Sequence, residues 1–437
     1  MLEIYAVAVA RMMALPPASP LSWTYQWYIH AVRDDRSRAE EVAALLPAAD
    51  RAQAASLWDT CEAHFDPRRV DFFLPWHRLF LWRTERIVRH LTREARFTMP
   101  YWNYADPANR ALPAEFRRPD DPFWRSLYRA ERYPQVNDGA PIDRDAEAVI
   151  DLASMMSATY RDSGSDAGFS FNLDNAPHTA VHVDVGDRTH GMGTIAWAAN
   201  DPIFWLHHCA IDRIWASWNR AGGRNPDEAE FLDQGFVFID ETGRPARAAV
   251  AEAMTTASLG YAYDSYLARP AGSLPFGAVR PAVMHAALAS GTPPIRLVGD
   301  ALALALDGAP GRMTLRQAFE SDRAFVLRIG GLRTAAQPKI SYRVFLGPDA
   351  ATSGSTADPG YTATISAFGA IPREGDPRSG PSPSIVPRAY SFVVTDRVRE
   401  LQDAGRVAEV LRVALAPTGT PVPDAEVTLD QIALLSI

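Results

Sequence analysis

The stretch NDPIFWLHHCAIDRIWASW, residues 200–218, carries the pattern that decides the fold of the first half of the chain. Its apolar residues recur every three or four positions, and the Asn-Asp-Pro that opens it is typical of a helix start. Two consecutive histidines on a helix point about 100° apart. One of His207 and His208 can therefore bind a metal ion while the other packs beside it. Asp212, one turn after His208, is placed to accept a hydrogen bond from an imidazole.

A second pair of histidines precedes this helix in PHTAVHV, residues 177–183. His178 and His182 are four positions apart, so both imidazoles project from one face of a helix and can meet a single ion. A zinc protease would need a glutamate directly after the first histidine as its general base, and this chain has Thr179 there. The pair therefore predicts a metal site and argues against a protease.

Three further candidate ligands, His30, His64 and His77, lie upstream of both pairs. FFLPWHRLFLWRTERIVRH, residues 72–90, predicts an amphipathic, aromatic-rich helix with Pro75 and His77 near its start. His30 lies in SWTYQWYIHAV and His64 in CEAHFDPRRV. Taken singly, each of these three fits an ordinary buried histidine as well as a metal ligand. Taken together with His178, His182 and one of His207 and His208, they make six histidines with no carboxylate or thiolate partner, which favours a borderline soft ion such as copper over magnesium or calcium.

The apolar pattern changes in the second half of the chain. Helical spacing prevails up to about residue 255, whereas short β-rich runs such as FVLRIGGL and ISYRVFLG follow after about residue 275. We therefore expect an α+β protein with an N-terminal helical domain at residues 1–255, a connector at 256–294 and a C-terminal all-β sandwich at 295–437. Nine of the ten histidines lie in the first 208 residues, so any histidine chemistry belongs to the helical domain.

Composition narrows the class of protein. The net charge of −8 argues against a nucleic-acid partner, and no apolar run approaches the roughly 20 residues needed to cross a bilayer. Two cysteines allow at most one disulfide and say little about compartment. The N-terminal stretch MLEIYAVAVARMMALPP lacks a basic region before its apolar residues, so we expect a first helix there rather than a signal peptide, and by default a cytoplasmic location.

The strings FFLPWHR, HTAVHV and NDPIFWLHHCAIDRIW together resemble the tyrosinase, catechol oxidase and hemocyanin family of type 3 copper proteins. The resemblance covers roughly residues 20–220, and SWTYQWYIHAV resembles the first helix of the family. It implies a four-helix bundle that holds two copper ions, CuA and CuB. The implied CuA ligands are His30, His64 and His77, and the implied CuB ligands are His178, His182 and His208, with His207 beside them.

His64 is the implied ligand at which this chain departs from the family pattern. The family usually places this histidine nine residues before the one in PWHR, where this chain has Arg68, and an insertion, FDPRRV, would bring His64 into the role. Some relatives join a cysteine to this histidine through a thioether, and Cys61 lies nearby at a different spacing.

The resemblance also implies the reaction, which is that of a tyrosinase or catechol oxidase. The expected partners are dioxygen and a phenolic small molecule, an o-diphenol above all, and nothing in the sequence identifies a copper chaperone. Monophenol hydroxylation would depend on residues near CuB. Thr179 stands where many hydroxylases carry asparagine, Asp174 resembles an acid that helps to hold a water, and Ile195 stands where some relatives carry a blocking phenylalanine. The β-rich part weakly resembles the domain that covers the active site in plant and fungal relatives.

Three other functions remain open at this point. A hemocyanin-like oxygen carrier would share the same six histidines, but it must deny phenols access, and Ile195 with a single copper cassette favours an enzyme. An o-aminophenol oxidase of natural-product synthesis would use the same site. A remnant without copper would be favoured if Arg68 rather than His64 occupied the ligand position.

Overall fold

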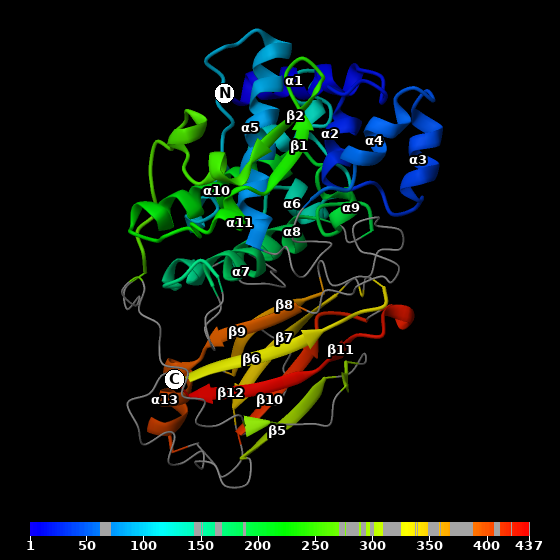
Figure 1. Ribbon diagram of the computed structural model, residues 1–437. Coiled ribbons are helices and arrows are strands. Elements are labelled where there is room, and N and C mark those ends of the chain that lie inside the picture. The colour runs from blue at the N-terminus through cyan, green and yellow to red at the C-terminus, as the bar shows by residue number, and fades with distance from the viewer. Residues whose placement is uncertain are drawn as a thin grey trace. The chain divides into compact units, whose positions relative to one another are not determined.

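The computed structural model describes residues 1–61, 71–143, 150, 152–161, 168–186, 189–270, 276, 288–289, 294–297, 301–308, 325–336, 338, 340–347, 358, 360–367, 388–405, 411–420 and 422–436. The chain forms two units, each described below by itself (Figure 1). The first comprises Met1–Ala146, Ile150–Arg161 and Gly168–Gly277, and the second comprises Glu147–Val149, Asp162–Ala167 and Ala278–Ile437.

The first unit is mainly helical. Its helices are α1 (Leu2–Ala14), α2 (Trp23–His30), α3 (Arg38–Leu45), α4 (Arg51–Leu57), α5 (Phe73–Thr92), α6 (Pro134–Asn137), α7 (Phe169–Leu173), α8 (Thr179–Val185), α9 (Ile195–Ala198), α10 (Ile203–Arg220) and α11 (Ala229–Leu232). A π-helical turn, η6 (Asp174–His178), joins α7 to α8. The strands β1 (Gly235–Ile239) and β2 (Pro245–Ala249) form an antiparallel hairpin.

The longest helices, α5 and α10, form where the sequence predicts them. α10 begins directly after Pro202, and the Asp201 side chain accepts a hydrogen bond from the backbone N–H of Ile203 at 3.0 Å. Every residue of α10 from Ile203 to Trp218 is buried, which makes it a central helix of the unit. No helix in the described part of the chain is long and apolar enough to cross a membrane.

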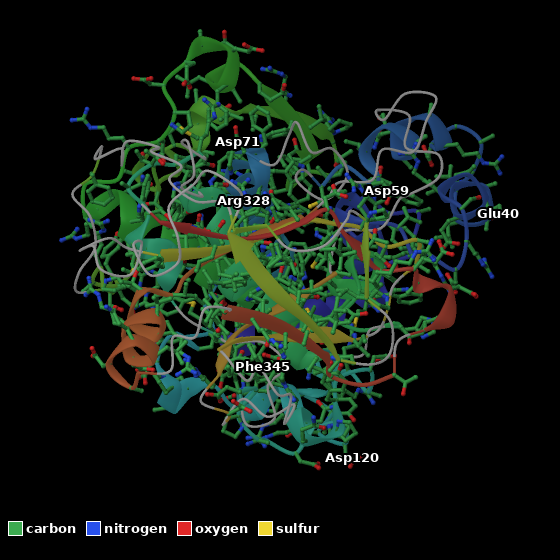
Figure 2. All side chains as sticks on the ribbon, turned by 90° about the horizontal axis from the view of Figure 1, so that it is seen from below. Glu40, Asp59, Asp71, Asp120, Arg328 and Phe345 are labelled. Carbon is green, nitrogen blue, oxygen red and sulfur yellow. The ribbon has the colours of Figure 1, made fainter. Side chains whose placement is uncertain are left out.

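Shorter helices are fixed by capping side chains. The Ser22 side chain accepts a hydrogen bond from the backbone N–H of Tyr25 and so caps α2 at its N-terminus. Ser37 and Glu40 form a capping box at the start of α3, and Glu40 lies exposed at the periphery of the molecule (Figure 2). The last residue of α2 is His30.

The second unit is β-rich. Its strands are β3 (Leu288–Ala289), β4 (Ile295–Arg296), β5 (Leu302–Gly308), β6 (Phe325–Leu332), β7 (Ser341–Gly347), β8 (Tyr361–Ser366), β9 (Arg388–Val393), β10 (Leu411–Pro417), β11 (Thr428–Leu429) and β12 (Gln431–Ser436), with one helix, α13 (Thr395–Asp403). Eight strands pair in the order β8-β7-β10-β5-β3-β12-β6-β9, and every pairing is antiparallel.

One apolar core contains side chains from strands at both ends of this pairing order, β8 and β9. The same buried cluster contains Ile365 of β8, Leu415 of β10, Leu306 of β5, Ile329 of β6 and Tyr390 of β9. Strands distant in the order thus pack on each other through a shared core, as the layers of a sandwich do. The α+β fold class predicted from the sequence, a helical domain followed by a β domain, is confirmed.

Candidate metal centre

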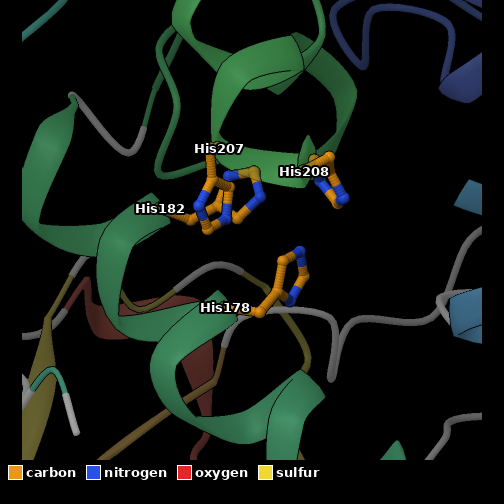
Figure 3. A group of neighbouring side chains, drawn as sticks. All are labelled: His178, His182, His207 and His208. Atoms are coloured by element: carbon orange, nitrogen blue, oxygen red, sulfur yellow. The ribbon is translucent and has the colours of Figure 1, made fainter. Parts of the chain in front are cut away.

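Four histidines of the helical unit converge on one point. His178 and His182 come from η6 and α8, and His207 and His208 come from α10 (Figure 3). All four are buried, and one ligand atom from each lies within 4.8 Å of the others. The four-residue spacing of His178 and His182 predicts that their imidazoles lie close together, and the ring centroids are 4.6 Å apart.

Hydrogen-bond partners at Nδ1 orient three of these imidazoles. Nδ1 of His178 lies 2.9 Å from a carboxylate oxygen of Asp174, and Nδ1 of His182 lies 2.9 Å from the backbone carbonyl oxygen of Met192. Nδ1 of His207 lies 3.0 Å from the Tyr104 hydroxyl. An imidazole that donates through Nδ1 presents the lone pair of Nε2, which is how metal-binding histidines are commonly held.

A second group lies beside the first and consists of His30, Cys61 and His77, again with ligand atoms within 4.8 Å of one another. His30 ends α2 and His77 lies in the second turn of α5. Nδ1 of His77 donates to the backbone carbonyl oxygen of Phe73 at 2.8 Å, so its Nε2 faces the group. His64 and Arg68 lie outside the described residues.

The two groups adjoin each other. The rings of His77 and His208 are stacked, with centroids 4.2 Å apart and planes 7° apart. Aromatic side chains close around them: Phe73 lies 4.7 Å from both His77 and His178, and Phe204 lies 4.3 Å from His208, measured between ring centroids. The two sets of donor atoms thus lie side by side among buried aromatic side chains.

The electrostatics of the pocket favour neutral imidazoles. Burial, reinforced by the neighbouring His178, lowers the pKa of His77 to about 3. Burial likewise holds the pKa of His182, His207 and His208 well below the ordinary histidine value. These rings therefore keep their lone pairs at neutral pH, which is the form that binds metals.

Unsatisfied nitrogens show that the pocket suits a metal ion. Among the described residues, no hydrogen-bond partner faces Nε2 of His207 or either ring nitrogen of His208. Buried polar atoms without partners are rare in native proteins, and a missing ion is one of their ordinary explanations. Imidazole nitrogens together with a cysteine sulfur form a donor set that suits copper.

Asp174 and Thr179, expected to act on a water near CuB, both engage protein groups. The Asp174 carboxylate orients His178, and the Thr179 hydroxyl donates to the backbone carbonyl oxygen of Asp174 at 2.9 Å. Ile195 is half-buried as the first residue of α9. Their catalytic roles stay predictions.

Asp212 does not play the part expected from its position after His208. Its carboxylate accepts hydrogen bonds from Arg78 at 2.5 Å and from the hydroxyls of Tyr261 and Tyr263 at 2.6 Å each. The expectation that it accepts from an imidazole is wrong, because a buried guanidinium and two phenols take up both carboxylate oxygens.

Tyr104 and Met192 are the partners that the sequence did not reveal. Tyr104 is 103 residues from His207 along the chain, and Met192 contributes only a backbone oxygen to His182. No motif marks either contact: the first joins two distant segments, and the second uses a backbone oxygen ten residues after His182, which any residue type could supply.

The comparisons with known proteins agree with this geometry. The sequence model "common central domain of tyrosinase" matches residues 20–141 and 117–221, and "polyphenol oxidase middle domain" matches residues 225–270. A tyrosinase of Hahella sp. (strain CCB-MM4) is 32% identical over 295 residues, which are 60% of this chain and 60% of that protein. The chloroplastic polyphenol oxidase A1 of Vicia faba is 29% identical over 290 residues, 60% of this chain and 45% of that protein.

A solved structure supports the fold of the whole chain. The structure of latent apple tyrosinase has a TM-score of 0.62 at 22% identity, and the match covers 99% of this chain and 94% of the apple chain. This chain spans about half the length of the curated relatives that it matches.

The cytoplasmic location expected from the N-terminal sequence is wrong on this evidence. The stretch does form a helix, α1, as expected, but a helix at the start of a sequence does not set a compartment. The matched polyphenol oxidases of Vicia faba and Malus domestica are both named chloroplastic.

Four findings lead to one conclusion. They are the sequence motifs, the two adjoining groups of buried metal-ligand side chains, the matching domain models and the shared fold. The chain belongs to the tyrosinase and polyphenol oxidase family of type 3 copper proteins, whose cofactor is a pair of copper ions.

Proposed function

We propose that this protein uses dioxygen and two copper ions to oxidise o-diphenols to o-quinones. The observation that carries the proposal is the adjacency of the two buried groups, joined by the stacked rings of His77 and His208. The names of the relatives, tyrosinase and polyphenol oxidase, support the same class of substrate.

The proposed ligands are those implied by the family resemblance, namely His30, His64 and His77 for CuA and His178, His182 and His208 for CuB. His207 lies in the same group as the CuB ligands, and its Nε2 also has no partner among the described residues. His208 is preferred because its ring stacks on His77 of the other group, whereas His207 stacks on His178, 5.4 Å away.

Copper content of two variants distinguishes His207 from His208 as the third CuB ligand. We expect His208→Ala to lose one copper per chain. His207→Ala should keep both, with copper affinity lowered by about 10–100-fold, the usual effect of losing a residue that supports a ligand. Copper content after dialysis against a graded chelator checks this. If His207→Ala loses an ion and His208→Ala keeps two, the roles of the two residues are exchanged.

The side chains around the pocket prepare it for this chemistry. The copper pair, when bound, supplies two-electron exchange with dioxygen. The aromatic walls formed by Phe73 and Phe204 keep water away, and the hydrogen bonds that the Nδ1 atoms donate fix the histidines before any substrate arrives. Each o-diphenol gives up two electrons and two protons, and one dioxygen accepts those of two diphenols to form two waters.

Monophenol hydroxylation makes a further demand, because the phenol must first lose its proton. The hydrogen of the Thr179 hydroxyl already goes to a backbone oxygen, and the Asp174 carboxylate is engaged with His178. Both groups are thus less available to hold a proton-accepting water. We therefore propose that diphenol oxidation exceeds monophenol hydroxylation, with Ile195 leaving room for a phenol ring.

Turnover of matched substrates tests the proposal. Oxygen uptake by the copper-loaded protein should be rapid with a catechol and at least about tenfold slower with the corresponding monophenol, because a positioned general base contributes typically about 100-fold or more to a rate. Turnover of o-aminophenols but not catechols would move the assignment to an aminophenol oxidase. Two bound coppers with no turnover of any substrate would point to an oxygen carrier. If the β-rich unit covers the site, turnover should rise after its proteolytic removal.

A further inference from the structure

The helical unit contains a cavity of about 480 Å³ outside the two metal-ligand groups. Its lining comes mainly from α5, α10 and the segments 98–103 and 261–264, and among the described residues no member of either group lines it. The volume lies within the roughly 300–1,000 Å³ that is usual for sites of small organic ligands. We call it the tyrosine cavity, after three residues of its lining, Tyr101, Tyr261 and Tyr263.

Aromatic rings form much of the wall of the tyrosine cavity. Trp82 lines it together with the three tyrosines, and the ring centroid of Tyr263 lies 5.8 Å from that of Tyr101 and 5.9 Å from that of Tyr261. The guanidinium carbon of Arg213 lies 4.5 Å from the Tyr101 ring centroid, so one of these rings already holds a cation. Tyrosine and tryptophan rings pack against apolar groups and attract cations to their faces. The wall therefore suits a ligand with an aromatic body and a positive charge.

The tyrosine hydroxyls in the lining have already donated their hydrogens. Those of Tyr261 and Tyr263 donate to the Asp212 carboxylate at 2.6 Å each, and that of Tyr101 donates to the Asp264 carboxylate at 2.8 Å. An ionised carboxylate only accepts hydrogen bonds, so the direction of all three bonds is fixed. Each hydroxyl is left with an oxygen lone pair to offer. A ligand that bonds to these oxygens must therefore bring the hydrogens itself.

The charged side chains in the lining are all negative. Glu85, Asp212 and Asp264 line the cavity, and among the described residues no lysine, arginine or histidine side chain does. Arg89 pairs with Glu85 at 2.6 Å, and Arg78 pairs with Asp212 at 2.5 Å. The Asp264 carboxylate is exposed and accepts hydrogen bonds from neighbouring hydroxyls, with no ion pair to a described residue. One negative charge at the mouth of the cavity is thus left for a ligand to balance.

Helix α10 serves the tyrosine cavity and the metal centre with different residues. Cys209 and Asp212 line the cavity and are three positions apart, so they share a face of the helix, whereas His207 and His208 belong to the metal-ligand group. The Cys209 side chain is only 4% exposed, and no described residue forms a hydrogen bond with its sulfur. The sulfur is therefore a further acceptor, though a weak one, that a ligand can engage.

We propose that the tyrosine cavity binds a small organic cation that carries N–H donors on an aromatic body. The cationic head lies at Asp264 and donates to the tyrosine oxygens, and the body lies against Trp82 and the tyrosine rings. The site is separate from the dicopper centre. The inference does not depend on the proposed oxidase function.

Calorimetric titration of the copper-loaded chain with two matched probes tests the proposal. 2-Phenylethylguanidinium brings a positive charge and N–H donors, and it has no lone pair to give to copper. 2-Phenylethylurea has nearly the same shape and is neutral. We expect the guanidinium to bind at least about tenfold more tightly than the urea, because a hydrogen bond to a charged group is worth about 1.5 kcal/mol or more. Equal affinities would refute the preference for a cation, and no binding of either probe would refute the site.

One substitution tests the role of the carboxylate at the mouth. Asp264→Asn should weaken guanidinium binding by about two- to fivefold, the effect of losing an exposed ion pair, and should leave urea binding unchanged. Asp120→Asn is the matched control, because Asp120 is also exposed but lies outside the cavity lining (Figure 2). An equal loss of affinity in both variants would show a general effect of net charge and contradict the role of Asp264.

Methyl NMR of methionine residues locates the bound probe. Met99 lines the tyrosine cavity, whereas Met155 is fully buried and lies outside its lining. In a chain labelled with ¹³C at the methionine methyl groups, the phenyl ring of the guanidinium should shift the Met99 signal and leave that of Met155 in place. Met99→Leu identifies the signal by removing it. Binding that shifts Met155 but not Met99 would place the probe elsewhere and overturn the proposed site.

Discussion

Replacing His178 by alanine is expected to remove one copper ion per chain and to lower catechol turnover by more than about 100-fold. A residue that merely supports a metal ligand costs up to about 100-fold when it is lost, and His178 lies at the contact between the two groups. Its ring centroid is 4.6 Å from that of His182 and 6.4 Å from that of His77.

Copper analysis and oxygen uptake on the same preparation check this result. His90→Ala is the control, because His90 is exposed in the last turn of α5 and belongs to neither group. The control should keep two coppers and full turnover. Undiminished copper in His178→Ala would remove this residue from the ligand set.

Replacing Asp212 by alanine is expected to lower the free energy of unfolding by about 3–5 kcal/mol. The substitution leaves the fully buried Arg78 guanidinium without its carboxylate partner, and it also removes the acceptor of two tyrosine hydroxyls. Arg78 follows His77 directly in α5, while Asp212 lies one turn after His208 in α10. The ion pair thus links the two helices that carry proposed ligands of different copper ions.

Denaturant unfolding followed by tryptophan fluorescence measures this effect. All 11 tryptophans lie at or before residue 218, so the signal reports the helical unit alone. Glu241→Ala is the matched control, because it breaks the partly exposed pair with Arg86 and should cost about 1 kcal/mol or less. Equal shifts of the unfolding midpoint in Asp212→Ala and Glu241→Ala would mean that the buried ion pair does not stabilise the unit more than the exposed one.

The sequence was sufficient for the features that depend on local spacing. The interval between His178 and His182 predicts one helical face, and their rings do meet. The Asn-Asp-Pro start predicts α10, and the β-rich runs predict the strands of the second unit. Each of these depends on residues within a few positions of one another, where chain geometry leaves little choice.

The features that depend on distant contacts could not be predicted in this way. Asp212 lies one turn after His208, and this spacing predicts an imidazole partner. The helix instead turns that carboxylate toward Arg78, which is 134 residues away in the chain. The Tyr104 hydroxyl at His207 and the Cys61 sulfur at His77 likewise follow from tertiary packing. Spacing shows which residues can share a face, but not what faces them.

The copper content of the purified chain of residues 1–437 tests the central claim most directly. After reconstitution with copper and removal of loosely bound metal, elemental analysis should find two copper ions per chain. Catechol oxidation should rise in proportion to that content. A chain that retains fewer than two coppers, or that holds two and binds neither dioxygen nor any phenol, would contradict the assignment of this pocket as a working dicopper centre.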